Sequence, residues 1–233
     1  ACQYAMKNSI THRAEIESFI DGKEYGAESL VINGKICVLG IMQKWMTKPP
    51  YYAELGHSIP TDLTTEVEEK ATRYVYNAIK ALGINHGSVN MDMLITKEGK
   101  IHIIDIGARM GGNMIGPCII PYGTGIDYMG AMIQNAVADP IDLKSDEYTA
   151  VATKLLAFKE GIVQYLPDIE QFEKRFGVEV YHHMKVGMQI NEYHTNLDGC
   201  GYIVARADTQ EKAIKKAENA LNYFRNTIFL RTR

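Results

Sequence analysis

The sequence predicts an α+β fold, with an antiparallel sheet and helices in its first part and a smaller α+β unit after it. Two tight-turn signals, Asn33-Gly34 and the glycine-containing turn Lys97–Lys100, lie between runs rich in β-branched residues, as is typical of β-hairpins. Apolar residues at helical spacing occur in separate segments. A connector begins at Asp139-Pro140, so we expect two units, residues 1–140 and 141–233.

The first forty residues have the pattern of an antiparallel meander. Residues 2–9 are typical of the end of a helix, and alternating apolar residues predict strands at 14–20, 24–32 and 35–43. Asn33-Gly34 favours a type I′ turn between the last two strands, because both of its residues tolerate positive φ.

The next elements follow from proline, capping and glycine signals. Residues 45–60 carry three prolines and are expected to form a loop. Thr65 and Glu68 have the spacing of a capping box, which predicts a helix that ends at Gly83. Further along we expect a turn at Gly123–Gly125, helices at 126–138, 167–176 and 209–226, and strands at 150–158, 178–186 and 201–207.

Composition excludes several classes of protein. A net charge of −3 and the lack of a basic block with aromatic residues give no reason to expect nucleic acid as a partner. No apolar run reaches membrane-spanning length, so no membrane is expected either. The four cysteines are far apart, which argues against zinc and disulfides and favours a reducing compartment, the cytoplasm. The chain starts with Ala1 and shows no signal peptide, so we expect it to be part of a longer protein.

The most informative residues are two acids on the strands that flank the second turn. If these strands pair, Asp92 and Asp105 converge on one face of the sheet, where two carboxylates suit Mg²⁺. Arg109 follows the second acid in a glycine-flanked loop, and its guanidinium is suited to a phosphoryl or carboxylate group. The alternative is that both acids are solvated or ion-paired strand residues.

Three stretches together resemble the C-terminal half of ATP-grasp ligases. Residues 16–25 resemble the family's hinge strand, residues 90–92 its first metal-ligand strand, and residues 105–112 its second, usually written Glu-x-Asn-x-Arg. The resemblance covers about residues 1–140. Residues 141–233 are similar, more weakly, to the small C-terminal domain of the amino-acid-ligase and biotin-carboxylase-like branches, and residues 50–60 resemble a loop of dipeptide-forming ligases.

This resemblance implies a carboxylate–amine ligase. In this chemistry, a carboxylate attacks the γ-phosphate of ATP to give an acylphosphate, and an amine then displaces phosphate. The implied cofactors are ATP and Mg²⁺ or Mn²⁺, and the implied partners are a small-molecule carboxylate and an amine. A carbamoyl-phosphate-synthase-like or glycinamide-ligase-like member and a non-catalytic nucleotide- or partner-binding module remain alternatives. A homo-oligomer also remains open.

The resemblance also implies roles for individual residues at the nucleotide. Glu17, Ser18 and Ile20 would lie at the adenine edge, Glu24 at the ribose hydroxyls, and Leu94 against the adenine face. Lys44 and Lys48 are candidates for phosphate contacts, and Met93 is a candidate for either the adenine face or the core.

For the metal and the substrate, the resemblance implies a second set. Asp92 and Asp105 would hold the metal, and Arg109 and Asn90 would act at the substrate carboxylate and the γ-phosphate. Glu54 and His57 could line the substrate pocket or serve in turn packing, and Gly111 and Gly112 would offer backbone N–H groups to an anion.

The chain departs from the family pattern at two positions of the second metal strand. Asp105 stands where Glu is usual, and Gly107 where a metal-binding Asn is usual, which leaves Asn113 as the nearest substitute ligand. The family's preATP domain and glycine-rich loop would lie upstream of this chain. We therefore expect the chain alone to bind ATP weakly and to be inactive.

Overall fold

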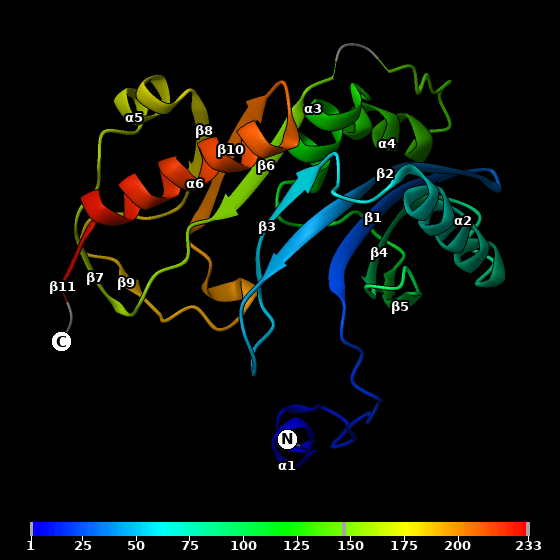
Figure 1. Ribbon diagram of the computed structural model, residues 1–233, viewed down its shortest axis with the longest axis horizontal. Coiled ribbons are helices and arrows are strands. Elements are labelled where there is room, and N and C mark those ends of the chain that lie inside the picture. The colour runs from blue at the N-terminus through cyan, green and yellow to red at the C-terminus, as the bar shows by residue number, and fades with distance from the viewer. Residues whose placement is uncertain (1, 146–147, 232–233) are drawn as a thin grey trace.

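The computed structural model describes residues 2–145 and 148–231. Within them, an antiparallel sheet runs through both halves of the chain (Figure 1), with the strand order β5-β4-β1-β2-β3-β6-β10-β8. Its strands are β1 (Lys23–Ile32), β2 (Lys35–Met46), β3 (Glu54–Ile59), β4 (Gly87–Ile95), β5 (Ile101–Gly107), β6 (Ala150–Leu155), β8 (Val178–His182) and β10 (Gly201–Ala207). A smaller sheet pairs β11 (Phe229–Arg231), β7 (Gly161–Tyr165) and β9 (Gln189–Ile190).

Helices cover both faces of the larger sheet. The covering helices are α2 (Thr65–Ala81), a π-helical turn (Ile115–Ile119), α3 (Ile120–Thr124), α4 (Tyr128–Ala136), α5 (Ile169–Phe176) and α6 (Gln210–Thr227). Two further elements lie outside these layers: α1 (Cys2–Asn8), which has no buried residue, and a 3₁₀ turn (Asn196–Asp198). In the described part of the chain, none of the helices is long and apolar enough to cross a membrane.

Two apolar clusters on opposite faces of the sheet make the core of the first half. Residues from β1, β2, β4 and β5 pack with α2 in one cluster, and residues from β1, β2, β3 and β6 pack with the π-helical turn, α3 and α4 in the other. Because side chains alternate along a strand, Val89, Met91 and Met93 of β4 enter the α2 cluster, and the residues between them face the other way.

The long helices begin and end where capping chemistry allows it. The Thr64 hydroxyl accepts a hydrogen bond from Val67 N at the start of α2, and Gly83 takes a left-handed φ of +67° just beyond its end. The Thr209 hydroxyl caps α6 in the same way, and the apolar face of α6 packs on β6 and β10.

Most of the predicted elements are confirmed, including both hairpins. Asn33 and Gly34 have φ values of +50° and +82°, as a type I′ turn requires, and β4 pairs with β5 across the second turn. The helices and strands predicted beyond residue 126 are all present, most of them shorter at one or both ends.

Four sequence expectations are wrong. Residues 14–20 form no strand, because this exposed segment has no neighbouring strand to pair with. Residues 45–60 are not all loop, since β3 pairs with both β2 and β6. The helix cap is Thr64 rather than Thr65, and the turn at Gly123–Gly125 is the end of α3, with only Gly125 left-handed.

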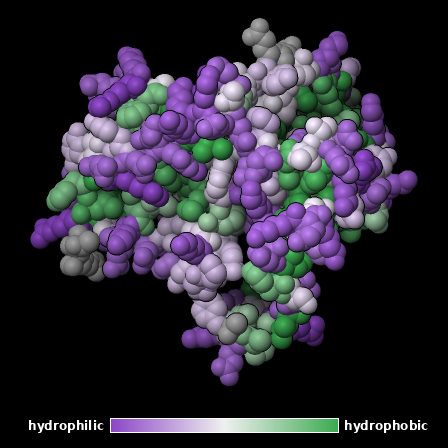
Figure 2. All heavy atoms as spheres, in the orientation of Figure 1, coloured by the Kyte–Doolittle hydropathy of each residue, from purple (hydrophilic) through white to green (hydrophobic). Residues whose placement is uncertain are grey.

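The N-terminal segment projects from the body of the molecule (Figures 1 and 2). The large apolar side chains that it exposes are Tyr4, Met6, Ile10, Ile16 and Phe19. The sheet also crosses the boundary expected between residues 140 and 141. Strand β3 pairs with β6 there through Ser58–Ala152 and Ile59–Val151.

Candidate active site

One face of strands β1, β2 and β4 carries a row of polar side chains. The register places Glu28 opposite Asn90, Gly26 opposite Asp92 and Glu24 opposite Leu94. Paired residues of an antiparallel sheet point to the same face, so these side chains lie together on the side away from α2. Gly26 lies beneath the place where two of these side chains meet, since a Cβ there would be in van der Waals contact with Lys44 Cδ at 3.6 Å and Asp92 Oδ1 at 3.9 Å.

Lys44 is the centre of this row. Its side chain is only 1% exposed, and its Nζ lies 2.8 Å from Glu24 Oε1, 2.6 Å from Glu54 Oε1 and 2.9 Å from Asp92 Oδ1. Burial disfavours the charged ammonium, but the three carboxylates more than offset this and raise the pKa of Lys44. Lys44 is therefore a permanent cation at neutral pH.

The same three acids form a candidate cation site. One carboxylate oxygen from each of Glu24, Glu54 and Asp92 lies within 4.8 Å of the others. Hard oxygen ligands of this kind suit Mg²⁺ and Mn²⁺, so the residues present fit the metal that the sequence implies. Each of the three carboxylates bonds Lys44, which offsets part of their negative charge.

Asn113, the predicted substitute ligand, is engaged at both ends of its amide. Its Nδ2 donates to Glu54 Oε2, and its Oδ1 accepts from the Tyr202 hydroxyl at 2.6 Å. Asn113 lies in the left-handed region with φ +51°, a conformation that asparagine tolerates. In this arrangement it positions Glu54.

His57 lies beside Glu54. Its side chain is 2% exposed, and its Nε2 is 3.9 Å from Glu54 Oε1. Burial lowers the pKa of His57 to about 4, so the imidazole is neutral at pH 7. Its Nδ1 is buried and has no hydrogen-bond partner among the described residues, which makes it a free polar group next to the acids.

Arg109 lies in the loop after β5 and points along the sheet. Its Nη1 donates to Met110 O at 3.1 Å and to Asn90 Oδ1 at 3.4 Å. Asn90 in turn donates through Nδ2 to Glu28 Oε2 at 3.0 Å. The guanidinium is largely exposed, so its remaining N–H groups are free to bind an anion.

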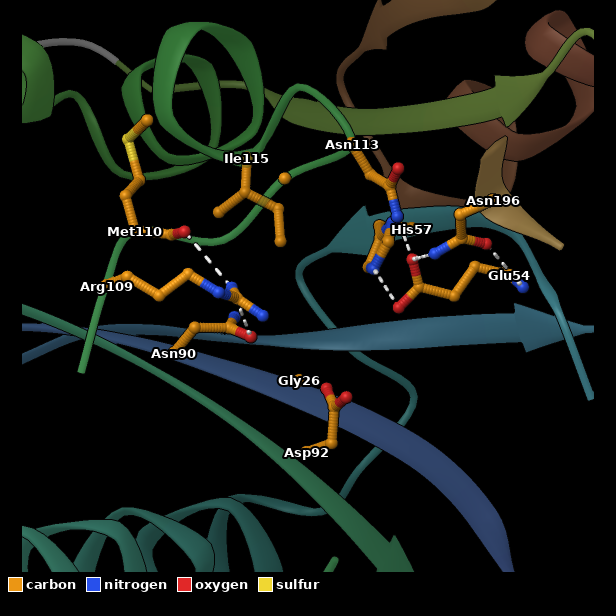
Figure 3. Close-up of a pocket in the computed structure, with 11 residues that line it drawn as sticks. Gly26, Glu54, His57, Asn90, Asp92, Arg109, Met110, Asn113, Ile115 and Asn196 are labelled. Carbon is orange, nitrogen blue, oxygen red and sulfur yellow. Dashed lines mark hydrogen bonds and ion pairs between the residues drawn. The ribbon is translucent and has the colours of Figure 1, made fainter. Parts of the chain in front are cut away.

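A hollow of about 440 Å³ lies between Arg109 and Glu54, and we call it the acidic hollow. Figure 3 shows Arg109 and Asn90 on one side and Glu54, His57, Asn113 and Asn196 on the other, with Asp92 between them. A cation thus lies at one end of the hollow and a carboxylate at the other.

A second pocket, of about 890 Å³, lies between the N-terminal segment and β4–β5. We call it the hinge pocket. Apart from Met93, it brings together the residues predicted at the adenine and the ribose: Glu17, Ser18, Ile20, Glu24 and Leu94. The lining is more apolar than that of the acidic hollow, with Phe19, Met46, Ile103 and Ile104 also present.

A third hollow joins the other two. It contains Lys44 and shares Glu24, Met46 and Tyr52 with the hinge pocket. It shares Glu54, Asp92 and Asn196 with the acidic hollow. The three cavities therefore lie next to one another and share walls. We call this row the trough, with the hinge pocket at one end, Lys44 in the middle and Arg109 at the other end.

The C-terminal part supplies site residues that the sequence analysis did not find. Asn196 Nδ2 donates to Glu54 Oε2 at 3.0 Å, and the Tyr193 hydroxyl donates to Glu54 O and to Asn196 Oδ1. Tyr202 holds Asn113. No local motif marks these residues, because they reach the site only through the β3–β6 pairing.

Glu28 is the other residue that was missed. It is fully buried and accepts hydrogen bonds from Tyr128, Asn90 and Gly111. The sequence does contain a signal for Glu28, because this acid stands in the middle of a predicted strand that is otherwise mostly apolar at its centre and end.

Three predicted residues lie apart from the acidic group. Asp105 is paired with Asp92 in the register, but its exposed carboxylate belongs to neither the three-acid group nor the hollows described above. Lys48 is exposed on the β2–β3 loop. Met93 is fully buried in the α2 cluster and so has the core role rather than the adenine one.

Comparisons with known proteins identify the family and the fold. Residues 2–117 match the family described as an ATP-grasp domain, and residues 154–227 match the L-amino acid ligase C-terminal domain 2. The L-amino acid ligase from Bacillus licheniformis is 25% identical, with a TM-score of 0.78 over 92% of this chain and 55% of that one. The phosphoribosylglycinamide synthetase from Anaerococcus prevotii is 23% identical, with a TM-score of 0.75 over the same shares of the two chains, and shows the fold alone.

The chain spans about half the length of these relatives. A curated relative, the uncharacterized protein y4rH of Sinorhizobium fredii, is 27% identical over 213 residues, which are 89% of this chain and 43% of its own length. The family matches and the fold of these relatives agree with the resemblance inferred from the sequence. The chain has the ATP-grasp fold and belongs to the ATP-grasp superfamily.

Proposed function

We propose that the chain is the C-terminal part of an ATP-dependent carboxylate–amine ligase. The observation that carries the proposal is the trough, a row of adjacent cavities in which the hinge pocket, Lys44 and Arg109 follow one another. This order fits adenine in the hinge pocket, the phosphates near Lys44 and Asp92, and a substrate carboxylate at Arg109. The match to the L-amino acid ligase C-terminal domain supports an amino acid as that carboxylate.

The charged residues of the trough act on different parts of ATP and the substrate. Glu24 accepts hydrogen bonds from the ribose hydroxyls, and Lys44 offsets negative charge on the phosphates. Arg109 orients the substrate carboxylate for attack on the γ-phosphate, and the acylphosphate that results keeps the same contact. A divalent cation, held by Asp92 with Glu24, Glu54 or Asp105, supplies neutralisation of the phosphate charge when bound.

The far end of the acidic hollow suits a cationic group. Glu54 is anchored by Asn113 and Asn196, and neutral His57 lies beside it. Arg109 and the Glu54 carboxylate line the same hollow, and their two opposite charges complement the carboxylate and the amino group of an amino acid. We therefore propose that Glu54 receives the amino group of the substrate whose carboxylate binds Arg109.

The test measures ADP release by the full-length protein with Mg²⁺, ATP and pools of amino acids. We expect ADP only when an amino acid is present, and Arg109→Ala should lower kcat/KM by about a hundredfold, as loss of one charge-stabilising donor does. The matched control, Arg73→Ala, removes an exposed arginine of α2 and should leave the rate unchanged. Amino-acid-independent ADP release, or equal rates for Arg109→Ala and the wild type, would refute the proposal.

One observation favours a second candidate, a non-catalytic nucleotide-binding module. Gly107 lacks a metal-binding side chain, and Asp105 lies outside the three-acid group. This candidate predicts Mg²⁺-dependent nucleotide binding by the full-length protein without ADP release under any amino acid. Measuring both quantities on the same sample separates the two candidates.

A further inference from the structure

Glu28 differs from the other acids of the site in how its charge is balanced. It is 0% exposed, and in the part of the chain that the structure describes it forms no ion pair. Neutral donors surround it: Tyr128 Oη at 2.5 Å, Asn90 Nδ2 at 3.0 Å and Gly111 N at 3.1 Å. These donors come from α4, β4 and the loop after β5, so one carboxylate ties three separate elements to β1.

The backbone of Gly111 lies close to this carboxylate. A Cβ at this position would lie 2.7 Å from Ile115 Cδ1, 2.8 Å from Asn90 Nδ2 and 2.9 Å from Glu28 Oε2. Contacts this short would force these side-chain ends to move, so a side chain at residue 111 would disturb the contact between its N–H and Glu28. The loop that carries Arg109 is thus fixed two residues downstream of the arginine.

Asn90 links the same carboxylate to the guanidinium. An amide has one acceptor and one donor group, and the Nδ2 group of Asn90 is used by Glu28. Its Oδ1 then faces Arg109 Nη1 at 3.4 Å. If the amide were turned over, its NH₂ group would face the guanidinium, and two donors would oppose each other.

We propose that Glu28 is a positioning residue, which sets the orientation of the Asn90 amide and anchors Gly111, and through both holds Arg109 over the acidic hollow. The functional part of this inference rests on the role proposed for Arg109, but the anchoring of the loop does not. A buried acceptor of this kind gives the arginine a fixed direction that its exposed, flexible side chain lacks by itself.

The first test measures hydrogen exchange at the Gly111 amide in the chain described here. Glu28→Met removes every acceptor at similar length and should speed exchange by about tenfold, because the amide loses its buried partner. Glu28→Gln keeps one acceptor oxygen and should restore most of the protection. Tyr128→Phe is the matched control: it removes one donor from the same carboxylate without touching Asn90 or Gly111, and exchange should stay within about twofold. Equal exchange in wild type and Glu28→Met would overturn the proposal.

The second test measures steady-state kinetics of the full-length protein. Glu28→Met should raise KM for the carboxylate substrate or lower kcat, with a combined loss of about tenfold, while KM for ATP stays within about twofold. Gly111→Ala should give the same pattern by displacing the loop, and it serves if Glu28→Met does not fold. Equal losses for ATP and the carboxylate would mean a general structural role and would refute the proposal. If the wild type shows no carboxylate-dependent turnover, the proposed function fails, and the exchange experiment alone decides the anchoring role of Glu28.

Discussion

Lys44 on β2 and Asp92 on β4 form an ion pair across the intervening strand β1, with Nζ 2.9 Å from Oδ1. The contact passes over Gly26 of β1. Because β1 lies between the two strands, this pair can form only if all three strands keep their register. It therefore links the order of the sheet to the charge at the middle of the trough.

Removing Lys44 should destabilise the chain and create a cation requirement. Lys44→Met leaves three partly buried carboxylates without their cation, which should lower the free energy of unfolding by about 3 kcal/mol. Mg²⁺ or Mn²⁺ should recover part of this loss, because the acids can then share a divalent ion. Urea unfolding with and without the metal measures both effects.

The control for that experiment is Lys48→Met, a substitution of an exposed lysine on the following loop, which should change the free energy of unfolding by less than about 0.5 kcal/mol. If Lys44→Met is as stable as this control, or gains no more than the wild type from the metal, the central role of Lys44 is wrong.

Asp105 should behave in the opposite way. Its carboxylate is exposed and makes no hydrogen bond or ion pair within residues 2–145 and 148–231, so Asp105→Asn should change the free energy of unfolding by less than about 0.5 kcal/mol. If Asp105 helps to hold the metal, the same substitution should weaken Mg²⁺-dependent nucleotide binding by about tenfold in calorimetry of the full-length protein. Unchanged nucleotide affinity would remove Asp105 from the metal site.

Asn196 should affect the substrate and not the nucleotide. Asn196→Ala deletes the 3.0 Å hydrogen bond to the Glu54 carboxylate, so Glu54 loses one of the groups that orient it. A hydrogen bond of about 1 kcal/mol corresponds to about a fivefold rise in KM for the amino acid, with KM for ATP unchanged. Asn222→Ala, an exposed asparagine of α6, is the control, and a parallel rise in both KM values would contradict this assignment.

The stability of the chain should depend on pH through Glu28. Burial raises the pKa of Glu28 from 4.5 to about 7, so the folded state binds this proton more tightly than the unfolded state. The resulting stabilisation is complete below pH 4.5 and is lost as the pH rises through about 7. Glu28→Gln has no such proton, so its free energy of unfolding should vary less between about pH 4.5 and 7.5. Parallel pH profiles of the two proteins in urea unfolding would refute the assignment.

The sequence predicted those parts of the fold that depend on neighbouring residues. The β4–β5 hairpin follows from local alternation and the glycine turn, and α6 follows from its helical spacing. Strand β3 was hidden because prolines flank it and because one of its two partners, β6, begins about ninety residues later. The alternating residues 14–20 were mistaken for a strand, since alternation alone provides no neighbouring strand to pair with.

The site was predictable to the extent that it lies on adjacent strands. Glu24, Asn90 and Asp92 lie in stretches that resemble the family, and Lys44 was a candidate for a phosphate contact. The register then brings them together. Glu54 joins them because β3 pairs with β2 next to Lys44, and Asn196 because the C-terminal part packs against β3. Glu28 was missed because its partners come from three elements whose packing the sequence does not show.

In the proposed reaction, a substrate carboxylate attacks the γ-phosphate of ATP and forms an acylphosphate. The most direct measurement supplies the full-length protein with Mg²⁺, ATP and an amino acid labelled with ¹⁸O in its carboxylate, and analyses the released phosphate by mass spectrometry. We predict one labelled oxygen in the phosphate. One carboxylate oxygen bridges carbon and phosphorus in the acylphosphate, and it leaves with the phosphate when the amine attacks the carbonyl carbon and the C–O bond breaks. Unlabelled phosphate, or AMP with pyrophosphate as the products, would show that no acylphosphate forms.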